Sequence, residues 1–484
     1  MDVFSFVEYI ISFFSSFFKE KSNDKEVVSK IYFELIYYSE LHSSNYKETI
    51  EIFNKLLSEN TVLSRPEKEL LRDRVSRNIE REKELFKRGE PFECNYCKLT
   101  RYSMRYCENC IIQHLKSQFG TWTSGSETID KFIRDCQSKS ALPLHIIEWI
   151  PFDQFEDLTY LTDGGFAKIY TAKWKRGAIL DWNESKQKFV YQGSHKVVLK
   201  SLNDSNKPTK EFFDEATALV NVRSGDIVNA YGITKFPQNG NYALVMNYFG
   251  EGCLRSYLEK NNETMGLKDK VFAIWRICFA LSDIHAQDLV HYDLHSGNIL
   301  LYTNRCLITD LGFCGPVDDE NVRKLYGVVP YMAPELFQGQ KYTKASDVYS
   351  VGMLMWEIFA GYPPFNDIPH DVKTISRIVF GLRPTMLSEI PNDIQSLIKR
   401  CWDGEPSKRP TIEEVLDVIK EQYRQILENE ELSIAYDNGK KTYSGSRIVN
   451  KPTNQTYYTS RILSYSAKEY AIPEDFNDED VDWD

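Results

Sequence analysis

The spacing of apolar residues predicts a helix close to the N-terminus. In "SRPEKELLRDRVSRNIEREKELFKRGE", Leu71, Val75 and Ile79 recur every fourth residue and form one apolar stripe on an otherwise charged segment. Ser64 and Glu67, just before that stripe, match the Ser-x-x-Glu capping box that begins many helices. We therefore expect residues 1–90 to form a helical region.

The pattern changes at about residue 155. Short runs of β-branched and aromatic residues, such as "HKVVLKSL" and "YALVMNYF", predict strands up to about residue 250, with one helical patch at 209–221. Helical spacing then continues from 267 to about 427. A β-rich small lobe followed by an α-helical large lobe is an α+β, two-lobed arrangement. We expect residues 155–427 to form this domain.

Residues 1–18, "MDVFSFVEYIISFFSSFF", are strongly apolar and need a separate interpretation. No basic segment precedes them, Glu8 interrupts them, and Lys19 ends the run below the length of a membrane-spanning helix. We favour a helix that is buried or faces a docking partner. Membrane contact is the alternative that we do not favour.

Composition is that of a globular protein, with 42% apolar and 27% charged residues, and 484 residues suggest two or three domains. The formal net charge is −11. The last twelve residues, "PEDFNDEDVDWD", hold seven acids and no base, which leaves −4 on the rest of the chain. This balance gives no indication of nucleic-acid binding.

Residues 428–484 lose the periodic order of the preceding segment. Ser, Thr and Tyr crowd the stretch from 433 to 470, and we expect this tail to be mostly disordered. The short run "SRIL" at 460–463 is its candidate for docking on the folded part.

Four of the ten cysteines form one cluster, Cys94, Cys97, Cys107 and Cys110, in residues 91–115. Two Cys-x-x-Cys pairs separated by nine residues can surround one tetrahedral ion, and Zn²⁺ is the usual metal for four thiolates. A redox or metal-free cluster is the alternative. We expect a structural zinc site in a reducing, cytoplasmic compartment, joined by a connector at 116–154 to the two-lobed domain.

Short motifs follow one another through the two-lobed segment: "LTDGGFAKIY", "KVVLK", "ALVMNYFGEGCLRSYL", "HYDLHSGN", "ITDLGFCGP", "YMAPE", "DVYSVG" and "CWDGEPSKRPT". Phosphoryl transfer needs glycines near the phosphates, a fixed cation, oxygen ligands for Mg²⁺ and a carboxylate beside the acceptor hydroxyl. The order of these motifs resembles the protein kinase family, and most closely its tyrosine-kinase-like group. With the cysteine motif in front, the arrangement resembles predicted fungal kinases.

The resemblance implies five catalytic residues. Lys200 pairs with Glu215 and reaches the phosphates of ATP, Asp293 accepts or orients the acceptor's proton, and Asn298 and Asp310 bind Mg²⁺. The residues expected to contact ATP are Leu161, Gly164, Gly165, Ala167, Ile169, Val198, Lys200, Met246, Asn247, Tyr248, Phe249 and Leu300. Since Thr162 and Ala167 replace two glycines of the usual loop, we expect modest nucleotide affinity.

Three further residues have supporting roles by the same resemblance. Glu335 and Arg409 are expected to pair inside the large lobe, and Asp347 to steady the loop that carries Asp293. The segment "KRGAILDWNESKQKFVYQG" is longer than most kinases use at this place, so we expect an insertion between two strands.

Two departures from the family pattern concern regulation and the acceptor. Tyr292 replaces the arginine that, in many kinases, grips a phosphate on the activation segment, and residues 311–334 contain no Ser or Thr to receive one. The acids at 318–320 are a candidate source of standing negative charge. His295 and Val328 replace the lysine and threonine usual in Ser/Thr kinases. Overall similarity favours Ser/Thr over Tyr as the acceptor.

Three functions remain open at this point. An active protein kinase, with a protein substrate and autophosphorylation in the tail, is favoured because all five catalytic residues are retained. A pseudokinase scaffold that acts by protein contacts is the alternative. Nucleic-acid binding by the cysteine region is disfavoured by the low net basicity.

Overall fold

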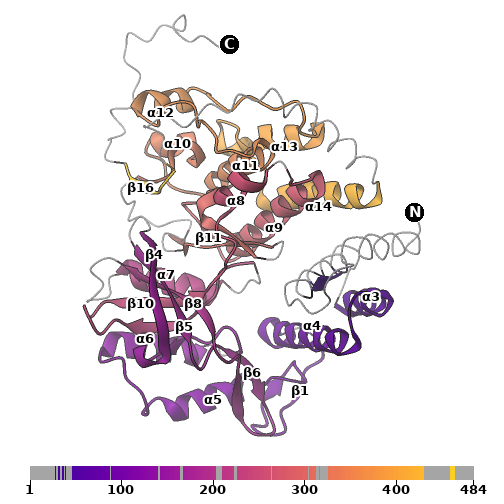
Figure 1. Ribbon diagram of the computed structural model, residues 1–484, viewed down its shortest axis with the longest axis vertical. Coiled ribbons are helices and arrows are strands. Elements are labelled where there is room, and N and C mark those ends of the chain that lie inside the picture. The colour runs from indigo at the N-terminus through magenta and orange to yellow at the C-terminus, as the bar shows by residue number, and fades with distance from the viewer. Residues whose placement is uncertain are drawn as a thin grey trace, which may run out of the picture. The chain divides into compact units, whose positions relative to one another are not determined.

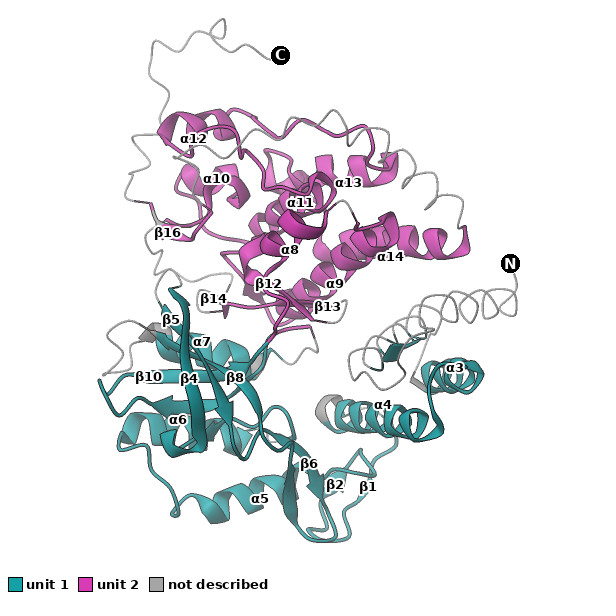
Figure 2. Ribbon diagram, viewed as in Figure 1, with its two compact units in different colours: residues 1–223, 228–248 teal, residues 224–227, 249–484 magenta. Residues whose placement is uncertain are grey.

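The computed structural model describes residues 46–429 and 458–463, together with scattered positions between 28 and 39. Short gaps fall at 88, 140–141, 164–166, 203–209, 223–225, 263, 303–304, 312–314 and 317–324. The expectations for residues 1–18 and for the acids at 318–320 lie outside the described residues. The chain divides into two compact units, residues 1–223 with 228–248 and residues 224–227 with 249–484 (Figure 2).

The first unit contains a six-stranded sheet in the order β3-β9-β10-β8-β5-β4 (Figure 1). Within this sheet, only β3 pairs parallel with its neighbour; the other pairs are antiparallel. The strands span Glu148–Trp149 (β3), Phe155–Asp163 (β4), Ala167–Trp174 (β5), His195–Leu202 (β8), Ala230–Lys235 (β9) and Tyr242–Asn247 (β10), and helix α7 spans Lys210–Asn221. Alternating residues of these strands form a core centred on Trp174, Val197, Leu199 and Val245.

The predicted insertion between β5 and β8 forms a hairpin of β6 (Ile179–Asn183) and β7 (Lys188–Tyr191). The segment before the sheet folds into β1 (Phe92–Glu93), β2 (Thr100–Arg101), α5 (Glu108–Gln118) and α6 (Glu127–Lys139). Tyr106, Ile111 and Leu115 pack with Ile179 and Trp182 of the hairpin in one buried cluster. The stretch expected to act as a connector thus also supplies α6 and strand β3 of the sheet.

The described N-terminal part consists of α3 (Tyr46–Glu59) and α4 (Arg65–Phe86). The predicted stripe is confirmed, because Leu71, Val75 and Ile79 are buried. The predicted start is confirmed as well, since the Ser64 N–H donates to the Glu67 carboxylate at 2.7 Å. The helix ends at Lys87, which adopts the left-handed conformation typical of a C-cap.

The second unit is mostly helical. Its main helices are α8 (Leu254–Asn261), α9 (Leu267–His285), α10 (Pro334–Phe337), α11 (Lys344–Ala360), α12 (Val372–Val379), α13 (Asn392–Cys401) and α14 (Ile412–Glu428). Short two-stranded pairings accompany them, of which β12 (Ile299–Tyr302) with β13 (Arg305–Ile308) and β15 (Tyr326–Gly327) with β16 (Arg461–Ile462) concern the site. Among the residues that the structure describes, no helix has the length and apolar character needed to cross a bilayer.

One buried ion pair fastens the second unit internally. Arg409 donates two hydrogen bonds to the Glu335 carboxylate, at 2.8 and 2.7 Å, and both side chains are almost fully buried. Such a bidentate pair fixes orientation as well as charge. It confirms the pairing expected from the sequence and holds the start of α10 to the loop that precedes α14.

Candidate active site and metal centre

In the first unit, Lys200 and Glu215 come together as expected. Lys200 lies near the end of β8 and Glu215 lies on α7, and Lys200 Nζ donates to Glu215 Oε1 at 2.6 Å. The Glu215 side chain is only 2% exposed. Because an unpaired carboxylate at such a depth would be costly, the pair fixes Lys200 relative to α7.

Several residues expected to contact ATP share one face of the sheet. Strand pairing sets Ile169 opposite Lys200, and Thr171 opposite Val198, which in turn opposes Met246. Directly opposed residues point to the same side of a sheet. Since Val197 and Leu199 belong to the core of the other face, this row faces away from that core.

The remaining expected ATP contacts lie at the ends of these strands. Leu161 is exposed on β4, and Ala167 is buried at the start of β5. Asn247 and Tyr248 follow Met246 at the end of the first unit. Phe249 and Leu300 belong to the second unit, with Leu300 half-buried on β12. Gly164 and Gly165 fall outside the described residues.

In the second unit, Asp347 holds the loop that carries Asp293. Its carboxylate accepts the backbone N–H of His291 at 2.8 Å and that of Tyr292 at 3.2 Å, and it contacts His285 Nε2 at 2.9 Å. Asp347 lies near the start of α11, and two of its partners come directly before Asp293. The steadying role expected of Asp347 is therefore supported by these contacts.

Asp293 and Asn298 lie against each other. The Asn298 side-chain amide donates to the Asp293 backbone oxygen at 3.0 Å and lies 3.4 Å from its carboxylate. The N–H of Thr309 donates to Asn298 O at 2.9 Å, which sets the following residue, Asp310, beside this loop. Asp310 has a φ of 62°, a strained conformation that is common at functional sites.

The place of the missing arginine is filled by packed aromatic rings. Tyr292, with a left-handed φ of 71°, packs its ring 4.7 Å from that of Tyr342. The Tyr342 hydroxyl donates to the backbone oxygen of Tyr326 at 2.6 Å. Burial and then the Asp293 and Asp310 carboxylates raise the pKa of Tyr326 above its usual value, so its hydroxyl stays protonated. The ring contact between Tyr292 and Tyr342 and the hydrogen bond from Tyr342 thus connect the loop at Tyr292 to Tyr326, near the end of the activation segment.

His295 is buried beside Asp293. Its Nε2 lies 3.6 Å from Asp293 Oδ2, and its Nδ1 accepts the N–H of Gly297 at 3.0 Å. Arg255 Nη2 approaches the same Nδ1 at 3.4 Å. Sequence reasoning included Arg255 only inside the motif "GCLRSYL" and gave it no role.

Gly327 lies at the edge of the same site. It has a φ of 144°, and a Cβ placed on it would lie 3.0 Å from Met332 Sδ and 3.5 Å from Asp293 Oδ1. Only glycine fits this strand without pressing on its neighbours. The sequence pattern alone did not single out this residue.

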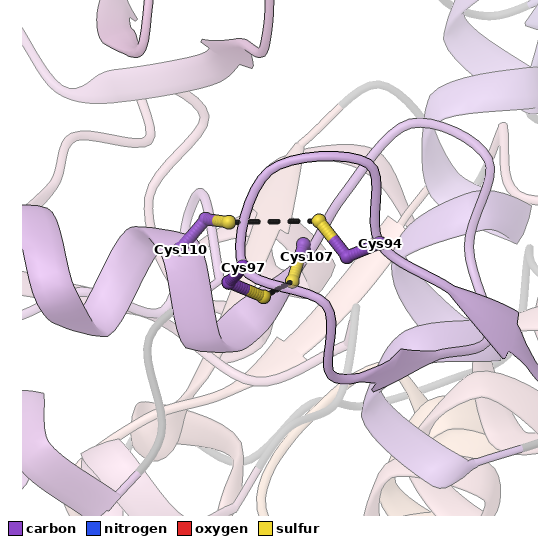
Figure 3. A group of neighbouring side chains, drawn as sticks. All are labelled: Cys94, Cys97, Cys107 and Cys110. Atoms are coloured by element: carbon purple, nitrogen blue, oxygen red, sulfur yellow. Dashed lines mark hydrogen bonds between the residues drawn. The ribbon is translucent and has the colours of Figure 1, made fainter.

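The four clustered cysteines meet as predicted (Figure 3). Their sulfur atoms all lie within 4.8 Å of one another, with Cys94 3.6 Å from Cys110 and Cys97 3.5 Å from Cys107. Thiolates around a tetrahedral Zn²⁺ stand about 3.8 Å apart, since each Zn–S bond is about 2.3 Å. The donor set therefore fits a single zinc ion.

Elements on both sides position these thiols. Cys94 and Cys97 lie in a tight turn, in which Cys94 N donates to Leu99 O at 2.9 Å, and Cys107 caps α5 while Cys110 lies in its first turn. Burial opposes ionisation of Cys97, but hydrogen bonds from the Leu99 backbone and the Asn109 side chain outweigh it and lower its pKa to about 7. Burial has the opposite effect on Cys107 and Cys110 and raises the pKa of both thiols, so a bound cation would be needed to keep all four as thiolates.

The family model described as protein tyrosine and serine/threonine kinase matches residues 156–419. The chain belongs to this protein kinase family. It is 27% identical over 282 residues to the probable serine/threonine-protein kinase gdt4 of Dictyostelium discoideum, covering 56% of this chain and 16% of that protein. It is 26% identical over 278 residues to the human cytoplasmic tyrosine-protein kinase BMX, covering 55% and 38%.

A probable LIM domain-containing serine/threonine-protein kinase of Dictyostelium discoideum is 30% identical over 241 residues, covering 48% of this chain and 37% of that protein. The chain thus matches about a sixth of gdt4 and less than two fifths of the other two. Relatives named for both acceptor types are present, so family membership does not fix the acceptor. The resemblance to the tyrosine-kinase-like group and to fungal kinases stays a prediction.

Proposed function

We propose that this chain is an active ATP-dependent protein kinase that transfers the γ-phosphate to serine or threonine hydroxyls of a protein substrate. The observation that carries the proposal is the 2.6 Å ion pair of Lys200 with the buried Glu215. A buried carboxylate gives no clear stability gain over an apolar side chain. A scaffold without catalytic demand would have no physical need to keep it.

The other assignments follow the geometry of each unit. Asn298 and Asp310 would hold Mg²⁺, which neutralises phosphate charge when bound. Asp293 would accept the hydroxyl proton of the acceptor, since Asn298 orients its carboxylate from one side at 3.4 Å. The face that carries Ile169, Val198 and Met246 would receive the adenine and ribose.

Two considerations support a Ser/Thr acceptor. Several relatives carry serine/threonine kinase in their names. In addition, the imidazole of His295 lies 3.6 Å from Asp293, so a short hydroxyl side chain reaches both groups. The ring of a tyrosine would need more room beside the base.

We also propose that the kinase needs no phosphate on its activation segment. Tyr292 packs on Tyr342, and Tyr342 in turn binds the Tyr326 backbone, so the loop and the segment are already connected. The four-cysteine centre is proposed to bind a structural Zn²⁺. Residues 1–90 are proposed to offer a docking surface for a protein partner.

The test is phosphate transfer from labelled ATP, with magnesium and casein as acceptor, by the full chain and by Asp293→Asn. General-base catalysis contributes about 10²–10⁴-fold, so the variant should lose activity on that scale. Asp288→Asn is the matched control, because that nearby carboxylate is 87% exposed and pairs only with Lys344 among the interactions described.

Each outcome has a definite meaning. Phosphoserine or phosphothreonine in the product supports the acceptor assignment, and phosphotyrosine contradicts it. Equal transfer by the wild-type chain and Asp293→Asn contradicts the role of the base. ATP binding with no transfer in any sample would favour the pseudokinase alternative instead.

A further inference from the structure

A short piece of the C-terminal tail lies on the catalytic half of the second unit. Residues 458–463 follow the helical part of the chain by about thirty positions and contain strand β16 (Figure 1). This strand pairs antiparallel with β15. Tyr326 opposes Ile462, Gly327 opposes Arg461, and Leu463 N donates to Leu325 O at 2.8 Å. The tail has added a strand to the end of the activation segment.

Side chains anchor this strand at both of its ends. Arg255 Nη1 donates to the backbone oxygen of Tyr458 at 2.6 Å, and the Tyr458 hydroxyl donates to Pro364 O at 3.1 Å. The Tyr458 ring lies edge-on to His370 at 4.9 Å. At the other end, Leu463 is 5% exposed. These contacts fix the register of the residues between them.

The anchored register sets the hydroxyl of Ser460 against His295, which in turn lies next to Asp293. His295 Nε2 lies 2.9 Å from Ser460 Oγ and 3.6 Å from Asp293 Oδ2. Since Nδ1 of the same ring accepts the Gly297 N–H, the neutral ring carries its proton on Nε2 and donates it to Ser460 Oγ. The serine's own proton then points away from His295, and the Ser460 hydroxyl also hydrogen-bonds the side chain of Tyr326.

The partner strand also lies against the carboxylate. A Cβ on Gly327 would be 3.5 Å from Asp293 Oδ1, and Gly327 is the direct partner of Arg461, the residue after Ser460. The tail strand therefore has two partners that are neighbours of Asp293, His295 through Ser460 and Gly327 through Arg461. Thr459, the neighbouring hydroxyl, is exposed.

We propose that residues 458–463 occupy the protein-acceptor site of their own chain and that Ser460 is phosphorylated there intramolecularly. This rests on the proposed kinase activity. In the reaction, Ser460 Oγ forms a bond to the γ-phosphorus of ATP, and the bond from that phosphorus to the β,γ-bridging oxygen breaks. The hydroxyl proton goes to Asp293, and ADP leaves. His295 acts as a positioning residue that holds the acceptor oxygen.

Phosphorylation of Ser460 would weaken the binding of residues 458–463 to the site. A phosphoserine adds a charge of about −1.5 to −2, and here it would stand beside the Asp293 carboxylate. Like-charge repulsion then favours release of the strand. Before modification, a tethered segment competes at an effective concentration on the order of millimolar, so an external substrate is largely excluded.

The experiment incubates the full-length kinase with magnesium and labelled ATP, with and without casein, and maps phosphate by mass spectrometry. Ser460 should be the first tail residue modified, at a rate per molecule that stays constant over a roughly hundredfold dilution of enzyme, as for an intramolecular step. Ser460→Ala should lose this phosphate. Thr459→Ala, the matched control at an exposed hydroxyl, should keep it.

Two anchor variants test docking separately from the hydroxyl. Tyr458→Ala and Leu463→Asp should each slow Ser460 phosphorylation about tenfold. In a Ser460→Ala background, in which phosphorylation cannot release the strand, each should also lower the KM for casein by a similar factor, because the tethered competitor is weakened. His295→Ala should slow Ser460 phosphorylation, and His295→Asn, which retains a donor, should restore part of the rate.

The outcomes separate this proposal from the kinase assignment. Transfer to casein with Ser460 unmodified would overturn the proposal and leave the kinase assignment standing. A rate per molecule that rises in proportion to enzyme concentration would also overturn it, since the step would then be intermolecular. Transfer to neither acceptor would overturn both.

Discussion

The cysteine-containing segment 92–118 and the tail segment 458–463 both lie outside the part of the chain matched by the kinase family. The first packs within the first unit and the second within the second unit. They do so by different means. The first buries aromatic and aliphatic side chains against hairpin β6–β7 and adds ion pairs to it, Arg105 to Asp181 at 2.6 Å and Arg101 to Glu184. The second relies on one short strand pairing and a few hydrogen bonds.

This contrast separates a permanent attachment from a reversible one. An apolar cluster with buried ion pairs loses several kcal/mol when it is opened, because each buried polar group then lacks a partner. A two-residue strand pairing is marginal by itself. The first segment should therefore unfold only with its unit, whereas the second can leave and return. Four predictions test this difference, in order of decreasing effect on stability.

The largest effect is expected on removing the metal centre. Cys107→Ser should abolish stoichiometric zinc and destabilise the first unit by about 5 kcal/mol, a lowering of its Tm by roughly 10–20 °C. Zinc analysis and calorimetry of the full chain measure both. Cys136→Ser, at a cysteine outside the cluster, is the control. An unchanged Tm in a zinc-free variant would contradict a structural role.

The second prediction concerns the joint between this segment and the hairpin. Asp181 accepts hydrogen bonds from Arg105 Nη2 at 2.6 Å and from the Tyr106 hydroxyl at 2.9 Å. Asp181→Ala removes the acceptor of both donors and should cost about 2 kcal/mol, or roughly 4–8 °C in Tm. Asp135→Ala, at an exposed acid on α6, should change the Tm by less than about 1 °C. Equal effects of the two variants on the Tm would contradict a stabilising role of Asp181 in the contact between the cysteine-containing segment and the hairpin.

The third prediction concerns the aromatic packing at the missing arginine. Tyr342→Phe keeps the ring that packs on Tyr292 but removes the hydroxyl that donates to Tyr326 O. The loss should be about 1 kcal/mol in stability of the second unit. Hydrogen exchange should quicken at Leu463, whose amide bonds the same segment through Leu325. Unchanged exchange would mean that the tail strand does not depend on this packing.

The smallest effect on stability is expected in the tail. Leu463→Ala removes an apolar anchor from a strand that the fold does not need, so the Tm of the second unit should shift by no more than about 2 °C. Exchange of the Leu463 amide should nevertheless rise several-fold. A large fall in Tm would show that the tail is part of the folded core and that the two segments do not differ in kind.

Much of the fold could be predicted from the sequence because its determinants are local. Helical spacing alone predicted the buried stripe of Leu71, Val75 and Ile79. The Ser-x-x-Glu motif predicted the helix start at Ser64. The pairing of Glu335 with Arg409 and the role of Asp347 followed from family motifs. The insertion was visible as extra length, and it forms the hairpin β6–β7.

The contacts between distant segments could not be predicted in the same way. The sequence "SRIL" was recognisable as a docking candidate, but its residues do not predict that it pairs with Tyr326 and Gly327. Strand β3 is two residues long and gives no periodic pattern. The place of His295 between Asp293 and Ser460 depends on tail, loop and segment together. Local patterns predict elements, whereas such long-range pairings depend on the whole fold.

The position of Gly327 limits how this protein can vary. A side chain there would press on Met332 and would require a φ that other residues rarely adopt. The same residue pairs with Arg461 of the tail. A mutation at this codon therefore disturbs the packing of Met332 and the pairing with the tail strand in one event. Natural variants of the protein should show substitution in the tail long before they show any at Gly327.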